Sequence, residues 1–468
     1  MSDSHSLKND LYDFQRDVLK KIPVAFEESP FFIDKTDRWL LTYRVFELVK
    51  QKWKQICENP ELQKHIGKCV RVGQWGPFRV TNEEALGMQV VTAIVERQAK
   101  GLQRVVLRYD DKVSEDLADF FLKDEVTIVA QAPIYYLGMR SDRPIALEEG
   151  LQLVPASPIS DEFILPTSLA EPLSEIRPSL ILEHRWHEKK TITELHDGPI
   201  NIVFPKASTP FREFVIILRL LGMSRFKAPF LQTGLLAPVF GAGYRLFHST
   251  PPWYPKSMSD VDQLDEQMTN GLVCAWKELR QVVPPEESER AQWLAIALDR
   301  MNMACERDQP IDKLLDLCIS LEALLTREPQ QVTYQFRQRG TLLLSLACQY
   351  LSKGQLEKAK KFLGKIYTAR SEIVHGKFQE TAEVEQANRR LFELARIFSL
   401  ECIALSHSFT RDQIIESIDL AMASTETRRE LEDKLKASAL APFWNKPYEK
   451  ASELFPPEPT GPVEPTFR

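Results

Sequence analysis

The chain has 468 residues, of which 43% are hydrophobic and 27% are charged, and its formal net charge is −6. This composition is typical of a soluble globular protein large enough for two or three domains. The negative charge excludes a generally basic surface for non-specific nucleic-acid binding, so any contact with nucleic acid needs a local site.

The sequence shows no sign of a membrane or secretory segment. Its first residues, MSDSHSLKNDLYDF, lack the apolar run of a signal peptide, and no run of eighteen apolar residues occurs. The seven cysteines form no Cys-x-x-Cys pair. Cys318, Cys348 and Cys402 stand in apolar helical contexts, which favours buried thiols in a reducing compartment. We therefore expect a cytoplasmic protein with no membrane partner.

The N-terminal part mixes helical and strand patterns. The first sixty residues place apolar side chains at three- and four-residue spacing, as in RWLLTYRVFELVKQKWKQI, and predict helices. From about 70 to 270, the helical segments EALGMQVVTAIVERQA and FREFVIILRLLGM stand among strand-like runs such as KCVRV, RVVLRY, VTIVAQAPIYYL and LQLVPAS. Residues 1–283 are thus predicted to form a mixed α/β region, which could subdivide near 70 and act as a sensor or recognition domain.

The chain becomes helical near Pro284 and remains so. The apolar spacing predicts four helices at about 311–326, 333–351, 355–375 and 381–408. We predict an all-α domain over 284–425 and a tail over 426–468, whose proline-rich end FPPEPTGPVEPTFR is expected to be disordered. The expected fold class is α+β, with a mixed α/β N-terminal region followed by a helical bundle.

One of these helices carries an arginine on its apolar face. In GQLEKAKKFLGKIYTARSEIVHGK, Arg370 falls on the apolar stripe, so it should face the packed side and need an acidic partner or a ligand. Glu322 is the only charged residue between Leu317 and Leu325, in a helix that is apolar nearly all round. The two can form an ion pair, and on these residues alone a structural pair is the favoured interpretation.

His375 follows Arg370 five residues later, at the flank of the stripe. Gly376 can end the helix in a left-handed conformation, which would put His375 in the last turn, where the helix dipole favours its cation. A histidine in such a place is usually a capping or surface residue. Beside an arginine, however, it suits phosphodiester chemistry, because imidazole can move a proton near neutral pH and guanidinium can grip phosphate oxygens.

The combined pattern resembles the HEPN superfamily, and more narrowly its Apea-like group. Arg370-x4-His375 in YTARSEIVHG is similar to the Arg-x4–6-His signature of HEPN domains. The segments DRMNMACERDQPIDKLLDLCISLEALL, FRQRGTLLL and IYTARSEIVHG occur in the order and spacing of the Apea-like group, over about residues 285–410. Upstream, IALEEGLQLVP and FVIILRLLG resemble the mixed α/β segments that precede such domains.

The resemblance implies a helical bundle that dimerises and brings two Arg/His pairs into one cleft. Active HEPN members are metal-independent endoribonucleases, in which the ribose 2′-hydroxyl attacks the phosphate and leaves 2′,3′-cyclic phosphate and 5′-hydroxyl ends. Carried over, His375 would act as general base or acid, Arg370 would stabilise the phosphorane, and Glu322 would orient Arg370. No metal or other cofactor is expected. The group is associated with prokaryotic conflict systems, so the resemblance implies anti-phage defence by RNA cleavage, with a trigger bound by the N-terminal region.

Ser371 marks a departure from the family pattern. Many active members have Asn, Asp or His directly after the motif arginine, where this chain has serine, which can still hydrogen-bond. A second interpretation is therefore a non-catalytic protein. In it, Arg370 and Glu322 form a structural pair, and the bundle binds RNA or dimerises.

An enzyme seated in the α/β region has no motif to support it. GQWGPF and FGAGYRLF contain glycines but match no phosphate-binding loop. His184, His187 and His196 lack further metal ligands at familiar spacing, so we interpret them as surface or loop residues.

Overall fold

The fold was examined in a computed structural model of the chain. It describes residues 2–27, 35–72, 75–98, 111–140, 143–155, 179–194, 205–223, 226, 230–235, 243–246, 262–282, 292–327, 330–347, 351–376, 383–445 and 454–456. The chain divides into two units, residues 1–211 with 225–263, and residues 212–224 with 264–468. The first combines helices with an antiparallel sheet and the second is helical, which confirms the α+β fold class.

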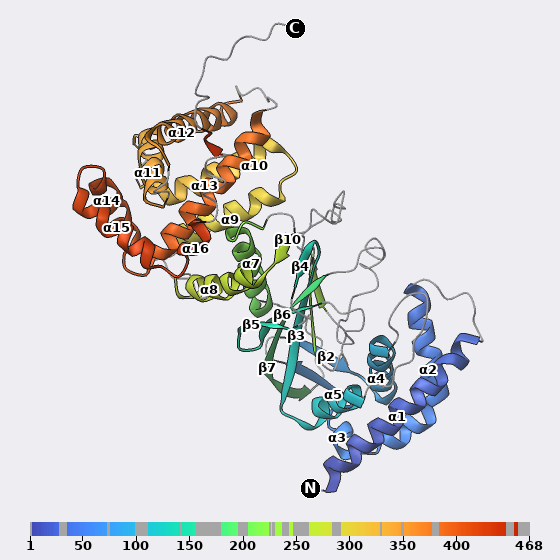
Figure 1. The fold of residues 1–468 in the computed structure, drawn as a ribbon. Coiled ribbons are helices and arrows are strands. Elements are labelled where there is room, and N and C mark those ends of the chain that lie inside the picture. The colour runs from blue at the N-terminus through green and yellow to red at the C-terminus, as the bar shows by residue number, and fades with distance from the viewer. Residues whose placement is uncertain are drawn as a thin grey trace. The chain divides into compact units, whose positions relative to one another are not determined.

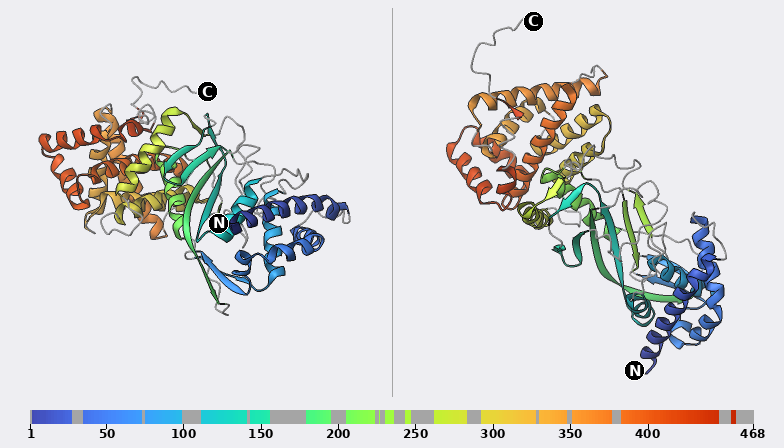
Figure 2. Two further views of the ribbon diagram at one scale, coloured as in Figure 1. Left: turned by 90° about the horizontal axis from the view of Figure 1, so that it is seen from below. Right: turned by 45° about the vertical axis from the view of Figure 1, so that its right-hand side comes forward.

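The apolar spacing predicted three helices of the first unit, and the structure confirms them as α1 (Ser2–Glu27), α2 (Lys35–Cys57) and α4 (Glu83–Gln98). Two further helices, the short α3 (Pro60–Gln63) and α5 (Asp111–Leu122), were not predicted. The blue helices α1 and α2 pack on each other, and α5 packs on α1 (Figures 1 and 2). Their shared core includes Phe14, Val90 and the fully buried Trp53, whose indole Nε1 donates to the carbonyl of Glu83 at 2.8 Å.

A mainly antiparallel sheet forms the rest of this unit. Among the described residues its strand order is β2-β1-β7-β3-β8-β9, and β6 pairs with both β5 and β7. The strands are β1 (Lys68–Val72), β2 (Trp75–Val80), β3 (Glu125–Ile134), β5 (Ile145–Glu148), β6 (Leu151–Pro155), β7 (Leu180–Glu194), β8 (Phe230–Leu235) and β9 (Gly243–Leu246). A separate pair joins β4 (Leu137–Met139) to β10 (Asp262–Leu264).

The long strand β7 corrects one prediction. His184 and His187 were expected on the surface or in a loop, but both lie within β7, where they pair with Ala130 and Thr127 of β3. His187 is exposed, as predicted, whereas His184 is half-buried and its ring lies 4.9 Å from that of Trp186. The strand is buried at its beginning and mainly exposed toward its end, so its sequence lacks the alternation that would have predicted it. His196 and the predicted strand RVVLRY lie outside the described residues.

The second unit is a helical bundle (Figure 1). It contains the end of α7 (Pro205–Leu220), followed by α8 (Glu266–Val282), α9 (Gln292–Glu306), α10 (Pro310–Leu325), α11 (Val332–Ala347), α12 (Lys353–Val374), α13 (Glu383–Ser406), α14 (Arg411–Ala421), α15 (Thr425–Ala437) and α16 (Ala441–Asn445). The four predicted C-terminal helices are confirmed as α10 to α13. None of the helices in the described part of the chain is both long and apolar enough to cross a membrane.

The helix α10 is central in this bundle. It packs against α9, α11, α12 and α13, and its buried face includes Leu317, Cys318, Leu321 and Leu324. Its one deeply buried carboxylate, Asp316, is 3% exposed and accepts from Arg300 at 2.9 Å and from Arg307 at 2.7 Å. A helix that is apolar on most sides needs neighbours on most sides, which explains its position.

The limits of the helical unit differ from the predicted 284–425. Its main stretch begins at Leu264, before the predicted boundary, because α8 packs on α13 and buries Trp276. Residues 212–224 belong to the unit as a separate stretch of chain. The expected tail from 426 begins with two ordered helices, α15 and α16, and α15 buries Leu431 and Leu435. The end that was expected to be disordered, residues 455–468, begins with Phe455, which is buried and packs on Phe362 of α12 at 5.8 Å between ring centroids, so its start is ordered. Residues 457–468 lie outside the described residues.

A fully buried acid lies in α13. Glu401 is 0% exposed, and neither of its carboxyl oxygens has a hydrogen-bond partner among the described residues. Burial raises the pKa of Glu401 well above its ordinary value. Burial therefore favours the protonated form of this carboxyl group, and no hydrogen bond within the described residues compensates its oxygens for the loss of water.

Replacing Glu401 by methionine is expected to raise the free energy of unfolding by about 1–2 kcal/mol at pH 7, because the apolar side chain has no polar atoms to desolvate. Because burial raises the pKa of Glu401 in the folded protein, the free energy of unfolding is not reduced below the unfolded pKa and decreases as the pH rises through the folded pKa. Glu401→Met should remove this decrease with rising pH, which urea unfolding between pH 5 and 9 measures. Glu357→Met, at an exposed position of α12, is the matched control and should change stability by less than about 0.5 kcal/mol.

Candidate RNA-binding and catalytic site

Arg370 of α12 and Glu322 of α10 form an ion pair. The Nε atom of Arg370 lies 3.2 Å from Oε1 of Glu322, and its Nη2 atom donates to Oε2 at 3.3 Å. The side chains are 29% and 19% exposed, so the pair lies at the edge of the core. The structure thus brings together the two residues that the apolar pattern had paired, with the arginine still open to solvent.

Close packing of α11 against α12 positions the arginine. Phe336 of α11 faces Tyr367 at 5.5 Å between ring centroids. At Gly340, a Cβ atom would lie 2.9 Å from Leu363 of α12, so the glycine permits this close approach. These contacts make the two helices antiparallel and fix the turn of α12 that carries Arg370, whose guanidinium carbon lies 6.0 Å from the centroid of the Tyr367 ring.

The ion pair with Arg370 does not fully compensate Glu322 for its burial. Burial raises the pKa of Glu322, and the charge of Arg370 opposes that rise without cancelling it. Burial also raises the pKa of the Tyr367 hydroxyl, assisted by the negative charge of Glu322. The desolvation of Glu322 therefore outweighs its attraction to Arg370.

His375 lies at the end of the same helix. It is the C-cap residue of α12, its side chain is exposed, and its backbone N–H donates to the carbonyl of Ser371 at 3.1 Å. Gly376 has φ +66°, which confirms the predicted left-handed termination. The half-buried Ser371 makes no side-chain hydrogen bond within the described residues. His375 is thus free to turn toward a ligand, whereas Arg370 is held.

An exposed aromatic residue stands near this end of the helix pair. Tyr334 lies in the first turn of α11 and is 57% exposed. Since Phe336 faces Tyr367 in the antiparallel pair, Tyr334 lies at the end where α12 carries Arg370 and then His375. Sequence reasoning missed Tyr334. The available signal was an aromatic residue off the buried face of VTYQF, but exposed aromatics are common without function.

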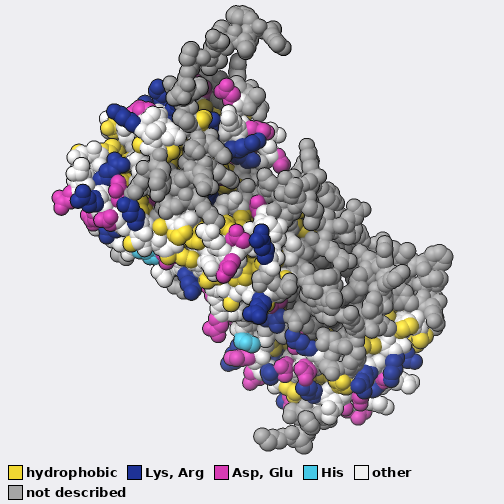
Figure 3. Space-filling view, viewed as in Figure 1, with side chains coloured by type: hydrophobic (Ala, Val, Ile, Leu, Met, Phe, Trp, Pro, Cys, Tyr) yellow, Lys and Arg dark blue, Asp and Glu magenta, His cyan; other side chains and the backbone are white. Residues whose placement is uncertain are grey.

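Charges of both signs mix on the visible surface. In Figure 3 the described Lys and Arg side chains are interspersed with Asp and Glu, and the face in view shows no extended single-sign patch over the described residues. This agrees with the net charge of −6. Any nucleic acid bound by such a surface must be held by a few placed groups.

Replacing Arg370 by methionine is expected to lower the free energy of unfolding by about 1 kcal/mol, far less than a fully buried pair would lose, because both charges reach solvent. Glu322→Gln should cost still less, since the raised pKa shows that burying this carboxylate is unfavourable. Urea unfolding of both single variants and the double variant at pH 7 measures the coupling. A coupling above about 3 kcal/mol would show instead a core ion pair with a mainly structural role.

Metal ligands do not gather in the described part of the chain. No group of three or more His, Cys, Asp and Glu residues there could hold a metal ion. Comparison of the chain with family models, curated proteins and solved structures found no match. Any assignment of function therefore rests on the residues and geometry described above.

Proposed function

We propose that the protein is a metal-independent endoribonuclease whose site is formed by Arg370 and His375, with Glu322 orienting the arginine. In this mechanism the imidazole of His375 takes the proton of a ribose 2′-hydroxyl, which attacks the adjacent phosphorus. The guanidinium of Arg370 stabilises the charge on the phosphorane oxygens. The 5′-oxygen leaves with a proton, and the products are a 2′,3′-cyclic phosphate and a 5′-hydroxyl.

The observation that carries this proposal is the contrast between the two residues. Arg370 is held by Glu322 and packed near Tyr367, yet is 29% exposed, so it can present donors in a fixed place. His375 is exposed at the terminus of the same helix. Tyr334 offers a ring on which a base can stack. The guanidinium and the imidazole can support phosphodiester cleavage, and the exposed ring can stack on a base.

A second copy of the chain completes the proposed site. Five residues separate Arg370 from His375, which corresponds to about 7.5 Å along a helix and about 140° around it. One copy therefore presents the two groups in diverging directions. A homodimer through this end of the bundle would place one histidine as base and the other as acid. We further propose a role in anti-phage defence, with the first unit binding a trigger.

The alternative function is a non-catalytic module that binds RNA or dimerises. The ion pair between Arg370 and Glu322 favours it, because a paired arginine has fewer donors left for phosphate. Ser371 favours it as well, because its side chain makes no hydrogen bond within the described residues that would orient the site.

Incubation of the purified protein with single-stranded RNA in EDTA tests the proposal. Cleavage to cyclic-phosphate and 5′-hydroxyl ends is the expected result. RNA binding without cleavage, measured by fluorescence anisotropy on the same RNA, would support the non-catalytic module. If neither cleavage nor binding occurs, with and without lysate from phage-infected cells as a source of trigger, the nuclease and the RNA-binding module are both wrong, and only a dimerisation module is left.

A further inference from the structure

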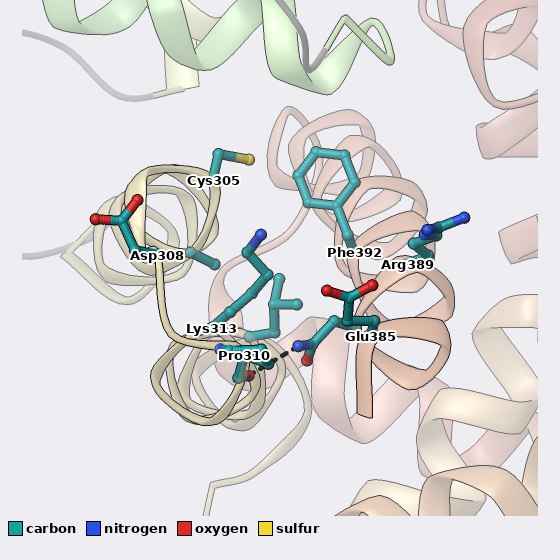
Figure 4. Close-up of a pocket in the computed structure, with 10 residues that line it drawn as sticks. Cys305, Asp308, Pro310, Lys313, Glu385, Arg389 and Phe392 are labelled. Carbon is teal, nitrogen blue, oxygen red and sulfur yellow. Dashed lines mark hydrogen bonds between the residues drawn. The ribbon is translucent and has the colours of Figure 1, made fainter. Parts of the chain in front are cut away.

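The helical unit contains a cavity that the proposed nuclease site does not use. Its volume is about 330 Å³, and it lies where the end of α9 meets the first turns of α10 and α13 (Figure 4). Leu317 of α10 is fully buried and Phe392 of α13 is half-buried, and both line it. This volume is at the small end of ligand sites, enough for a compact organic molecule.

Two opposite charges face this cavity without meeting. In Figure 4 the ammonium group of Lys313 and the carboxylate of Glu385 turn toward the space between α10 and α13. Neither forms an ion pair, with the other or with any further residue that the structure describes. The charged ends of Asp308 and Arg389 point away from that space. The cavity therefore separates one cation from one anion.

A buried amide holds the two walls in place. Nδ2 of Asn388 in α13 donates to the carbonyl of Pro310 in α10 at 2.8 Å, and Asn388 is only 3% exposed. Lys313 lies one turn after Pro310, and Glu385 lies one turn before Asn388. The two charges are thus mounted on helices that are joined next to the cavity, which is a preorganised arrangement.

We propose that this cavity binds a free apolar amino acid. The carboxylate of the ligand would pair with Lys313, its ammonium group with Glu385, and its side chain would pack on Phe392 and Leu317. A simple anion would be repelled by Glu385 and a simple amine by Lys313, so a zwitterion matches both charges. This proposal is independent of the nuclease function and of the N-terminal trigger.

Isothermal titration calorimetry of the full-length protein tests the ligand class. L-leucine and L-phenylalanine are the probes, each with an analogue that lacks the ammonium group (4-methylpentanoate, 3-phenylpropionate) and one that lacks the carboxylate (3-methylbutylamine, 2-phenylethylamine). We expect an amino acid to bind at least about tenfold more tightly than either of its analogues, since a factor of ten corresponds to about 1.4 kcal/mol. The proposal is overturned if neither amino acid binds below about 10 mM, or if the carboxylate analogue binds equally well and inorganic phosphate competes with it.

Substitutions locate the binding. Lys313→Met should weaken the amino acid about tenfold or more while leaving the amine analogue no weaker, and Glu385→Gln should show the reverse selectivity. Asp308→Asn and Arg389→Gln, whose charged ends point away, are the matched controls and should leave affinity within about twofold. Thermal unfolding checks that every variant is folded. Equal losses in the controls and in the two test variants would place the binding elsewhere and overturn the assignment.

Discussion

RNA cleavage by the His375→Ala variant is expected to fall by about 10²–10⁴-fold, the usual contribution of a positioned general acid or base. Stability should hardly change, because the side chain is exposed and the C-cap contact to Ser371 is made by the backbone. The loss from the helix dipole is limited to about 0.3–1 kcal/mol. The measurement is the initial rate of cleavage of a labelled RNA in EDTA, with thermal unfolding of the same samples.

Thr368→Ala is the matched control for this variant. Thr368 is exposed on the same helix, and its hydroxyl donates to the carbonyl of Gly364 at 3.1 Å, so its removal changes the surface near the site but no proposed catalytic group. Its cleavage rate should stay within about twofold of wild type. Wild-type cleavage that persists in His375→Ala would exclude His375 as base and direct attention to another residue or to a contaminating nuclease.

Acidification is expected to destabilise the first unit by up to about 3 kcal/mol through one residue, His65. His65 is 1% exposed and packs edge-on against Phe121 at 5.2 Å between ring centroids. Burial is the main cause that lowers the pKa of His65 from 6.5 to about 4, and the positive charge of Lys190 is the second. Its Nδ1 lies 3.0 Å from the carbonyl of Glu61, and its Nε2 has no hydrogen-bond partner within the described residues.

The sign of this effect follows from the two pKa values. Between pH 6.5 and about 4 the unfolded chain binds a proton at His65 and the folded chain does not, so stability is lost as the pH falls through that window. His65→Leu should be more stable than wild type at pH 4.5 and close to it at pH 7.5. Urea unfolding at both values measures this. His187→Leu, at an exposed position of β7, should retain the wild-type acid loss, and an unchanged loss in His65→Leu would assign it to other groups.

The helices of the bundle and the ion pair between Glu322 and Arg370 were both predicted from the spacing of apolar residues. A single charge in a long apolar segment, such as Glu322, must find a partner, and an arginine on another apolar face is the natural one. The pair of Asp316 with Arg300 and Arg307 follows the same logic. It was missed because an acid at the border of an apolar run looks like a surface residue.

Other features could not be predicted from local patterns. Glu401 sits in FSLECIAL, where its neighbours predict burial, but only the packing of α13 shows that the carboxyl meets no partner among the described residues. The cavity of Lys313 and Glu385 joins residues from helices distant in the chain, so no spacing rule reveals it. The role of Arg370 and His375 in RNA cleavage stays a prediction from sequence.

The helical unit is assembled from two separated stretches of chain, and this sets the order in which it can fold during synthesis. Arg219, 3% exposed near the end of α7, donates to the carbonyl of Asn302 at 2.5 Å, and Arg396 donates to the carbonyl of Leu220 at 3.0 Å. The second contact joins residues 176 positions apart. During synthesis on the ribosome, the carbonyl of Leu220 at the end of α7 therefore has no contact with Arg396 until α13 has emerged. A gene fragment that starts at residue 264 lacks the end of α7, so the guanidinium of Arg396 would lose this carbonyl partner.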